Sequence, residues 1–398
     1  MSKIKNANGQ GHIRKRNDRQ WEGQYSTFDA NGKRHRHSVY GSTQKEVQQK
    51  LNSKLNDIIN GTYIKTDKMT LAEWCDIWEK DYLGDIKAST YDQYDYQIRI
   101  HIKPTLGHYK LQKITPPMVQ RFYNESMKER KVLGKNGKTR TTKGLSPKSV
   151  KNLHGVMHKL FNQAVACRLI PNNPCTACKL PRIEKQEMKT LNDEQMTLFL
   201  EAIKDDEYEN LYFVDVFTGM RQGEIIGLTW DCVDFDKKII RVEKQLRKSH
   251  ALAGAEYAFT SLKNGKARLI RPSSDVFDVL KKERAKQAKN KLKYGSSYEN
   301  KDNLVFTNKI GEHLTAVTVY NHLKMILKTI NLDDRRFHDL RHTYATIALQ
   351  NGDNIKTVSK NLGHATVAFT LDVYGHVSEE MEKASADSMH KYIEKVSV

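Results

Sequence analysis

His338-Asp339-Leu340-Arg341-His342-Thr343, followed by Leu362-Gly363-His364 and by Val373-Tyr374-Gly375-His376-Val377, brings guanidinium, imidazole and phenol groups into one short part of the chain. A guanidinium beside a phosphodiester can donate two hydrogen bonds to its non-bridging oxygens. An imidazole can donate a hydrogen bond or move a proton there, and a tyrosine close by can act as a covalent nucleophile. Because a free phenol has a pKa of about 10, its neighbours must help to remove the proton near neutral pH. The stretch therefore predicts chemistry on a phosphate.

Together with two upstream motifs, this stretch resembles the tyrosine recombinases, and among them the integrases of conjugative transposons and temperate phages. The upstream arginine lies in Thr218-Gly219-Met220-Arg221-Gln222-Gly223-Glu224, and the lysine in Ser261-Leu262-Lys263-Asn264-Gly265-Lys266. A His-x-x-Arg pair recurs by chance in so basic a chain, whereas the ordered set is far more specific. The resemblance implies a catalytic set of six residues, with Lys266 as the alternative lysine: Arg221, Lys263, His338, Arg341, His364 and Tyr374.

The resemblance also implies what each group does. Tyr374 attacks the scissile phosphate and leaves a 3′-phosphotyrosine and a free 5′ hydroxyl. Negative charge on the phosphoryl oxygens is stabilised by preorganised donors, here Arg221, Arg341 and His364. His338 assists proton transfer, and Lys263 protonates the departing oxygen as a general acid. Because the bond energy stays in the phosphotyrosine, neither ATP nor a metal nor another cofactor is expected, and two rounds of exchange pass through a Holliday junction.

Local patterns support three of these residues and leave alternatives. Arg221 follows a glycine turn at a helix start, where free N–H groups and the helix dipole favour a phosphate. It can also simply pair with Glu224 on a surface helix. His338 and Arg341 lie three residues apart on one helical face, so they can contact one phosphate together. The pair His338 and His342 has the spacing of a metal site but lacks the glutamate of a metalloprotease motif, so no metal is expected there.

Tyr374 has rivals as the nucleophile. As one tyrosine among 18, Tyr374 can alternatively be an ordinary buried aromatic side chain. Tyr344 and Tyr392 are also available, but neither follows the Leu-Gly-His turn, whereas the spacing of Tyr374 from His364 fits the integrases. His364 can alternatively fill the core or the turn, so part of its contribution is expected to be packing.

Composition favours a nucleic-acid partner. The 398 residues include 67 Lys and Arg against 47 Asp and Glu, a formal net charge of +20, and such an excess favours a polyanion. No apolar run of about 18 residues suggests a transmembrane helix, and the polar, basic N-terminus lacks the apolar segment of a signal peptide. A cytoplasmic protein without membrane partners is expected.

The cysteines are few for this length and odd in number, which argues against a disulfide framework. Cys175-Thr176-Ala177-Cys178 has metal-ligand or redox spacing but lies in a proline-rich linker without a second such pair. Two reduced, incidental thiols are therefore expected. The five cysteines are Cys75, Cys167, Cys175, Cys178 and Cys232.

The N-terminal part, residues 1–65, predicts a small sheet braced by one helix. Trp21, Tyr25 and Phe28 mark a strand pair with a turn at 29–32, and residues 44–59 carry apolar side chains at helical spacing. This arrangement is similar to the arm-DNA-binding domain of the integrases. A basic, solvated tail is the alternative.

Residues 66–180 predict an all-helical domain, similar to the core-binding domain of the family. Thr70 and Glu73 form a capping box. A second helix runs from about Ser89 toward Ile102, stopped by Pro104 and Gly107. Two more begin at Thr115-Pro116-Pro117 and Ser146-Pro147. The basic segment 128–143 between them predicts a surface hairpin that contacts the DNA backbone without reading bases.

After a linker, residues 187–398 predict the catalytic domain. Asn192 with Gln195 predicts a capping box, and Leu191 with Met196 a hydrophobic staple. Three strands are expected near 239–242, 257–260 and 267–270, with Lys263 on the hairpin turn between the last two. The terminal helix has an apolar stripe that packs on its own core or, as the resemblance implies, docks on a neighbouring protomer. The stripe comprises Met381, Ala384, Met389, Tyr392, Ile393 and Val396.

The sequence thus indicates a multidomain, mainly α fold with small β-sheets, ending in a mixed α/β catalytic domain. The expected function is site-specific recombination of double-stranded DNA at attachment or terminal sites by a homo-tetramer, with an excisionase and a host DNA-bending protein as possible partners. A type IB topoisomerase and a non-catalytic DNA-binding regulator are the alternatives. The residues expected to contact DNA outside the catalytic set are Arg14, Lys15, Arg16, Arg34, Arg36, Lys135, Lys138, Arg140 and Lys143.

Overall fold

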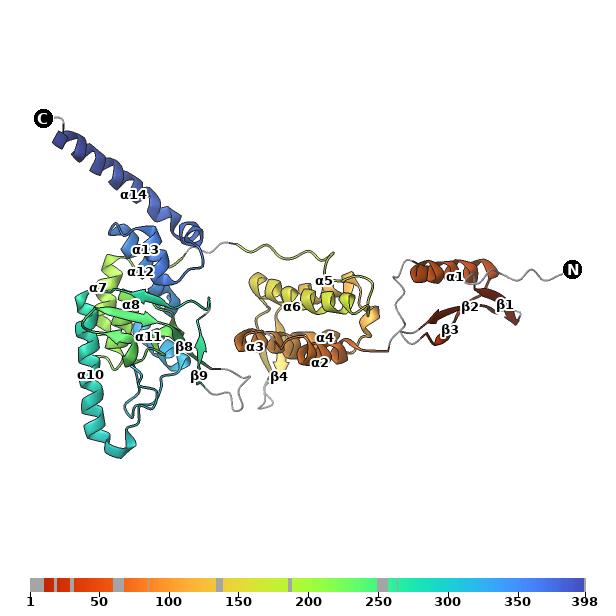
Figure 1. Ribbon diagram of the computed structural model, residues 1–398, viewed down its shortest axis with the longest axis horizontal. Coiled ribbons are helices and arrows are strands. Elements are labelled where there is room, and N and C mark those ends of the chain that lie inside the picture. The colour runs from red at the N-terminus through yellow and green to blue at the C-terminus, as the bar shows by residue number, and fades with distance from the viewer. Residues whose placement is uncertain are drawn as a thin grey trace. The chain divides into compact units, whose positions relative to one another are not determined.

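The computed structural model describes residues 11–17, 20–28, 32–59, 68–84, 86–133, 139–184, 188–248, 257–262 and 264–396. The chain forms two compact units, residues 1–184 and 185–398 (Figure 1). The fold is mainly helical with small sheets, as expected. Within the described ranges, no helix is long and apolar enough to span a membrane. The finer division into three domains, at 1–65, 66–180 and 187–398, stays a prediction.

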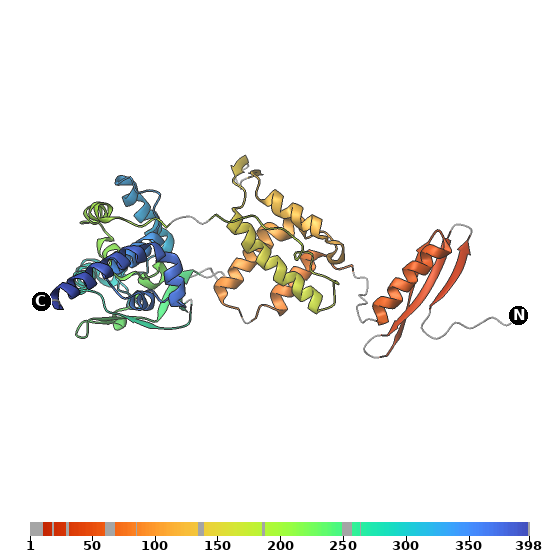
Figure 2. The same ribbon diagram turned by 90° about the horizontal axis from the view of Figure 1, so that it is seen from above.

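The first unit begins with a three-stranded antiparallel sheet in the order β1-β2-β3. Its strands are β1 (His12–Asn17), β2 (Gln20–Phe28) and β3 (Arg34–Gly41). Helix α1 (Gln44–Ile59) covers one face of the sheet (Figure 2). Its buried Val47 and Leu51 approach Gly23 so closely that an added Cβ would lie 2.8 Å from Val47. The prediction of a folded module is therefore confirmed, while residues 29–31 of the predicted turn lie outside the described ranges.

A helical module follows in the same unit. Its elements are α2 (Leu71–Asp81), α3 (Ala88–Gln97), the π-turn η1 (Ile98–Ile102), α4 (Lys103–Leu106), the 3-10 turn η2 (Leu111–Lys113), α5 (Pro116–Ser126), the hairpin of β4 (Arg130–Leu133) and β5 (Thr139–Thr142), and α6 (Pro147–Ala166). The capping box of Thr70 and Glu73 is confirmed. Trp74 and Phe161 are fully buried in a core shared by these helices.

The prediction that Pro104 stops the second helix is wrong. The chain widens into the π-turn, where the N–H of Lys103 bonds to the carbonyl of Ile98, and a new helical turn begins there. Pro104 then occupies a first-turn position, where its missing N–H costs no hydrogen bond. The helical path ends at Gly107 instead.

The helices of the second unit pack around one large core and around a smaller cluster of buried residues that includes Tyr374. They are α7 (Asp193–Ala202), α8 (Glu209–Thr218), α9 (Gln222–Ile225), α10 (Ser274–Tyr294), α11 (Ala316–Thr329), α12 (Phe337–Gln350), α13 (Ile355–Leu362) and α14 (Val367–Val396), with the 3-10 turns η3 (Trp230–Cys232) and η4 (Gly295–Ser297). The predicted capping box of Asn192 and Gln195 is present. Leu191 and Met196 are both buried in this core, in agreement with the predicted staple.

Two small antiparallel sheets lie in this unit. One has the order β10-β7-β6 and the other pairs β8 with β9. Their strands are β6 (Val233–Asp234), β7 (Ile239–Val242), β8 (Lys244–Lys248), β9 (Tyr257–Ser261) and β10 (Arg268–Ile270). The prediction that β9 and β10 form one hairpin is wrong, because β9 pairs with β8 and β10 with β7. The lysine segment therefore connects two sheets.

Helix α14 carries Tyr374 at a break in its backbone. The residue has φ −119° and ψ 19°, outside the helical region, so the helix kinks there. Before the kink, α14 packs against α12 and α13; after it, the helix extends beyond the neighbouring helices of the unit (Figure 1). The kink separates the segment that holds the phenol from the terminal tail.

Candidate active site

Arg221 occupies the N-cap of α9, directly after a tight turn. The turn depends on Gly219, which ends α8 with φ +60°, a conformation that favours glycine. A Cβ there would also lie 2.5 Å from Tyr344. Glycine at this position thus lets the chain reverse and places Arg221 at a helix start, as predicted.

Glu224 is buried between two guanidinium groups. Arg221 donates from Nη1 to its Oε1 at 2.8 Å, and Arg268 donates from Nη1 and Nη2 to its two oxygens at 3.0 and 2.6 Å. Burial raises the pKa of Glu224, but the bonds and charge of Arg268 and then Arg221 outweigh it and lower the pKa to about 2. The carboxylate therefore stays ionised and holds both arginines in place.

Arg341, on α12, is tied to two turns. Its Nη1 donates to the carbonyl of Gly219 at 2.7 Å, and its Nη2 donates to the carbonyl of Leu362. Arg221 reaches the adjacent carbonyl of Gly363 at 3.2 Å. Both guanidiniums thus converge on the Leu362–His364 turn. Burial, and then Arg221, lower the pKa of Arg341 to about 9, so it keeps its charge at neutral pH.

The histidines of the predicted set lie beside these arginines and stay neutral. His338 is exposed, yet surrounding protein atoms, His342 and Arg341 lower its pKa to about 4. Burial, Arg341 and Arg221 lower the pKa of His364 to about 4 as well. The Nδ1 of His364 lies 2.8 Å from the Thr370 hydroxyl. Neutral imidazoles can donate one hydrogen bond each to a phosphate without a full positive charge.

Tyr374 is only 2% exposed, and its phenol lies near Arg341. Its Oη lies 2.7 Å from Nδ1 of His342, on α12. Burial raises the pKa of Tyr374 to about 12, and the charge of Arg341 opposes that rise. A base must therefore accept the phenolic proton for the oxygen to act as a nucleophile.

The structure brings together five of the six predicted catalytic residues, from α9, α12, the turn after α13, and α14. Lys263 lies outside the described residues. Its neighbour Asn264 donates to the carbonyl of Gly363 at 3.1 Å, so the lysine segment reaches the turn that Arg221 also contacts. Lys266, the alternative, is exposed. The choice between the two lysines stays open.

Two members of the site were absent from the predicted set. The sequence suggests His342 only as a metal ligand, although its spacing of four residues from His338 places both on one helical face. Arg268 carries no local signal, because its partners Glu224 and Asn361 lie 44 and 93 residues away. Its Nε donates to the carbonyl of Asn361 at 2.6 Å, which ties strand β10 to the end of α13.

This fold and this grouping of guanidinium, imidazole and phenol define the class of enzymes that cut and rejoin DNA through a tyrosine. Residues 182–381 match the phage integrase family, and residues 70–127 match the N-terminal SAM-like domain of phage integrases. The chain belongs to the phage integrase family, the tyrosine-type site-specific recombinases.

Relatives cover most of the chain. A tyrosine recombinase XerC-like protein of Caldanaerobacter subterraneus subsp. tengcongensis is 31% identical, over 91% of this chain and 93% of its own. The ICEBs1 integrase of Bacillus subtilis is 27% identical, over 77% of this chain and 78% of its own. The Tn1549 transposon integrase in complex with a circular intermediate DNA is similar in fold, with a TM-score of 0.64, 20% identity, and 80% of this chain and 100% of that chain covered. A lambda integrase tetramer bound to a Holliday junction is also similar in fold, with a TM-score of 0.52 and 17% identity. The match covers 89% of this chain and 95% of that chain.

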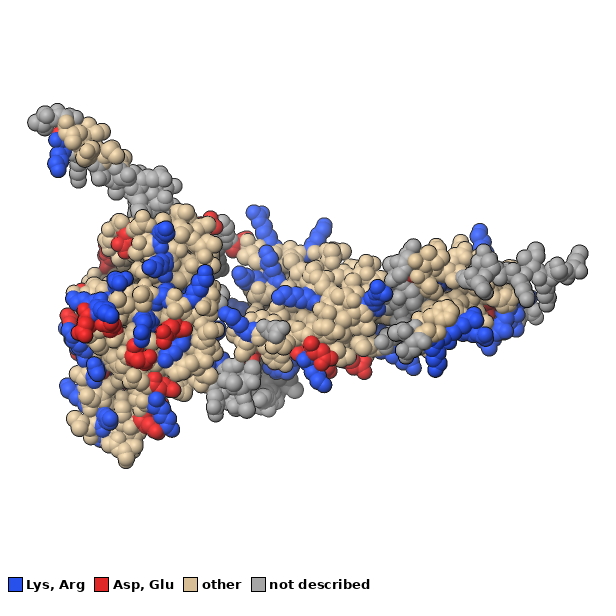
Figure 3. Space-filling view, in the orientation of Figure 1, with Lys and Arg blue, Asp and Glu red and all other residues tan. Residues whose placement is uncertain are grey.

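The predicted DNA contacts of the first unit fall into three groups. Strand alternation and the register place Arg14, Arg34 and Arg36 on the sheet face opposite α1. Arg16 lies over the Tyr40 ring on the same face. Lys15 lies on the face that α1 covers. Figure 3 shows Lys and Arg gathered on this module. Lys143 is exposed after β5. Lys135 and Lys138 lie outside the described residues, as does the side chain of Arg140.

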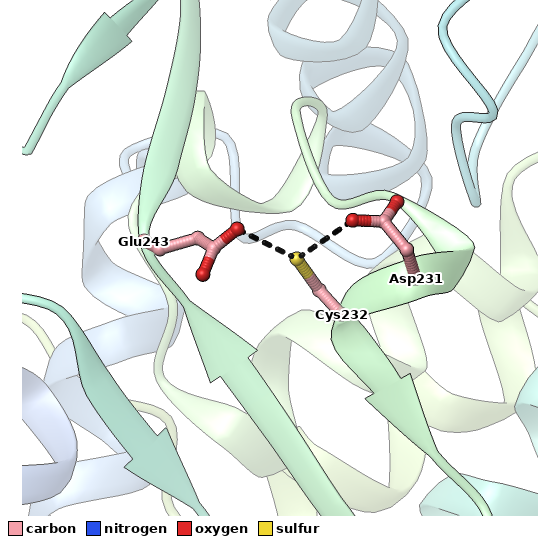
Figure 4. A group of neighbouring side chains, drawn as sticks. All are labelled: Asp231, Cys232 and Glu243. Atoms are coloured by element: carbon pink, nitrogen blue, oxygen red, sulfur yellow. Dashed lines mark hydrogen bonds between the residues drawn. The ribbon is translucent and has the colours of Figure 1, made fainter.

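Three potential metal ligands among the described residues are linked by hydrogen bonds. Asp231, Cys232 and Glu243 lie together, with the thiol donating toward Glu243 at 3.5 Å and Asp231 at 3.8 Å (Figure 4). Burial raises the pKa of Cys232, which disfavours the thiolate that a metal would need. Cys175 and Cys178 are free thiols whose pKa values are also raised by burial.

Asp215, on α8, is a buried carboxyl group that the site does not use. It is fully buried, and within the described part of the chain neither carboxyl oxygen has a hydrogen-bond partner. Burial raises its pKa well above the ordinary value, although Arg341 opposes the rise. An aspartate with a raised folded pKa destabilises the fold at every pH above its unfolded pKa.

Asp215→Asn is therefore expected to stabilise the protein at pH 8 by about 1 to 3 kcal/mol, because a neutral amide costs less to bury than a carboxylate. The gain shrinks as the pH falls toward about 4, where the unfolded carboxyl is protonated too. Urea unfolding at pH 8 and pH 5 measures both values. Asp236→Asn, at an exposed position, serves as the control and should change little. A variant less stable than the parent at pH 8 would contradict the expectation.

Proposed function

We propose that this recombinase integrates and excises a mobile DNA element by cutting and rejoining double-stranded attachment sites through a 3′-phosphotyrosine and a Holliday junction. The observation that carries this proposal is the placement of the Tyr374 phenol near Arg341, within a group that also includes Arg221 and His364. Two guanidiniums held by carbonyls and Glu224 leave their remaining donors for one phosphate. Preorganised donors of this kind stabilise the charge that develops in phosphoryl transfer.

The proposed reaction assigns one role to each group. Tyr374 attacks the phosphorus, and Arg221 and Arg341 neutralise the non-bridging oxygens. His338 and His364 donate further hydrogen bonds. Lys263 or Lys266 protonates the leaving 5′ oxygen. No step calls for ATP or a metal ion.

The basic face of the β1–β3 sheet is proposed to hold arm DNA. Arg14, Arg16, Arg34 and Arg36 share that face with the exposed Phe28, and the segment that includes Lys135, Lys138, Arg140 and Lys143 contacts the DNA backbone. Because phosphate contacts release counterions, binding should weaken steeply with salt. We place the protein in the cytoplasm with its DNA. An excisionase and a host DNA-bending protein are proposed as its partners.

The tail of α14 is proposed to assemble the tetramer by docking on a neighbouring protomer. Its apolar residues Met389, Tyr392, Ile393 and Val396 are 52 to 60% exposed in the isolated chain. A stripe of this kind needs a surface to cover it. A second copy bound to the same DNA supplies one.

Deleting residues 380–398 is expected to leave DNA binding largely intact but to weaken assembly on DNA at least about tenfold. That loss, about 1.4 kcal/mol, is a fraction of the roughly 6 kcal/mol that burial of four apolar side chains provides. Native gels and sedimentation of DNA complexes measure the multimers. Glu394→Gln, a change at an exposed charge of the same helix, is the control. Unchanged multimers together with unchanged recombination would refute docking by the tail.

A nicked suicide substrate separates the proposal from its rivals. The nick lets the 5′ fragment diffuse away after cleavage, so a recombinase accumulates covalently bound to a duplex that carries its recombination site. A DNA-binding regulator traps no adduct. A type IB topoisomerase traps one but relaxes supercoiled DNA as a monomer and exchanges no strands. Covalent trapping and strand exchange between two sites are the expected results.

A further inference from the structure

The hydroxyl of Tyr374 has one close partner, and that partner is outside the predicted catalytic set. Its Oη lies 2.7 Å from Nδ1 of His342, and the two ring centroids are 5.9 Å apart. His342 is half-buried on α12, against which the Tyr374 segment of α14 packs. Among the described residues, the phenol makes no other hydrogen bond. The contact is short enough for direct proton transfer.

We propose that His342 is the general base that accepts the proton of Tyr374 during cleavage and returns it during religation. The inference rests on the proposed function and moves the proton-transfer role from His338 to the residue one helical turn later. His338 meets the edge of His342, with ring centroids 4.8 Å apart, and lies at the exposed side of the pair. That position suits hydrogen bonding to a phosphate instead.

The step balances in both directions. In cleavage, the phenolic proton moves to Nδ1 while the bond from Oη to phosphorus forms, the bond from phosphorus to O5′ breaks, and the lysine protonates O5′. In religation, the 5′ hydroxyl gives its proton to the lysine as the bond from O5′ to phosphorus forms, the bond from phosphorus to Oη breaks, and the imidazolium returns its proton to Oη. The acceptor Nδ1 requires the tautomer of His342 that carries its proton on Nε2.

The surroundings keep His342 ready to accept a proton. Burial lowers its pKa below the ordinary value of a histidine, Asp339 opposes this, and Arg341 and Arg336 reinforce it. The ring is therefore neutral at neutral pH. Cleavage should depend on its neutral form and be lost as the pH falls through its pKa. The groups that face it are His338, Asp339, Arg341 and Arg336 from α12, Tyr374 from α14, and His364 from the turn after α13.

The test compares His342→Gln and His342→Asn with the parent, each carrying either tyrosine or a more acidic fluorinated tyrosine at position 374. Both amides can hydrogen-bond to the phenol but cannot take its proton. Cleavage of the suicide substrate should fall about 10² to 10³-fold in both variants. The cleavage rates of both variants should rise with pH up to about 9. The cleavage rate of the parent should stay constant over that range. The fluorinated tyrosine should accelerate the variants more than the parent.

Several outcomes would overturn the assignment. One is a cleavage rate and pH profile in the His342 variants that match the parent. Another is an equal effect of fluorination in parent and variants, which is expected if His342 only positions the Tyr374 ring. A selective rescue of His338→Gln by fluorination would return the role to His338. If the parent itself traps no adduct, the proposed function fails instead. Similar DNA affinity of parent and variants, measured in the same buffers, verifies that the variants are folded.

Discussion

Tyr374→Phe is expected to lower covalent trapping on a suicide substrate by at least about 10⁴-fold, because removal of a nucleophile leaves only the binding contributions to catalysis. DNA affinity and its salt dependence should stay unchanged, since the phenol is buried and contacts His342 rather than the surface. The variant also shows whether the buried hydroxyl matters for folding. Its loss removes one hydrogen bond, about 1 kcal/mol.

Tyr344→Phe is the matched control for that experiment. Tyr344 is a half-buried tyrosine of the same unit, and the change removes only the bond that its hydroxyl accepts from Asn361 at 3.1 Å. This control should still form the adduct. Persistent trapping by the Tyr374 variant, together with loss in the Tyr344 variant, would move the nucleophile to α12.

Arg341→Lys is expected to slow cleavage about 100 to 1000-fold, equivalent to about 3 to 4 kcal/mol of transition-state stabilisation. A lysine ammonium cannot contact the carbonyls of Gly219 and Leu362 and also present a planar pair of donors to the phosphate. One buried carbonyl then loses its partner, so stability should fall by about 1 to 3 kcal/mol as well. Single-turnover cleavage at saturating protein separates this chemical defect from weaker binding.

Arg336→Lys controls for the loss of a guanidinium on the same helix. Its side chain is 66% exposed at the start of α12 and pairs loosely with Asp339 at 3.5 Å, so its replacement should change the cleavage rate less than about threefold. A rate for Arg341→Lys equally close to that of the parent would contradict the role given to the buried arginine.

Local chemistry made much of the fold predictable. The capping boxes at Thr70 and Asn192 and the prolines at the starts of α5 and α6 act within one turn of helix, so their spacing alone located those helix starts. The pairing of β10 with β7 was not predictable in this way. It depends on contacts between segments that are distant in sequence, which a turn motif around Gly265 does not encode.

The same distinction applies to the site. His338 and Arg341 are neighbours on one helix, so one motif revealed both. Arg268 works through Glu224 and Asn361, which other elements bring to it. The contact of His342 with Tyr374 likewise depends on the packing of α14 against α12. Side chains that act through tertiary contacts became visible only in the folded structure.

Peptide mapping of the trapped adduct tests the central claim most directly. Trypsin cleavage after Lys360 and Lys383 yields the peptide 361–383, whose only tyrosine is Tyr374, while Tyr344 and Tyr392 fall in other peptides. After nuclease trimming, mass spectrometry should find the 3′-linked nucleotide on Tyr374 of that peptide. A nucleotide carried by the peptide of Tyr344 or Tyr392, with 361–383 unmodified, would contradict the account.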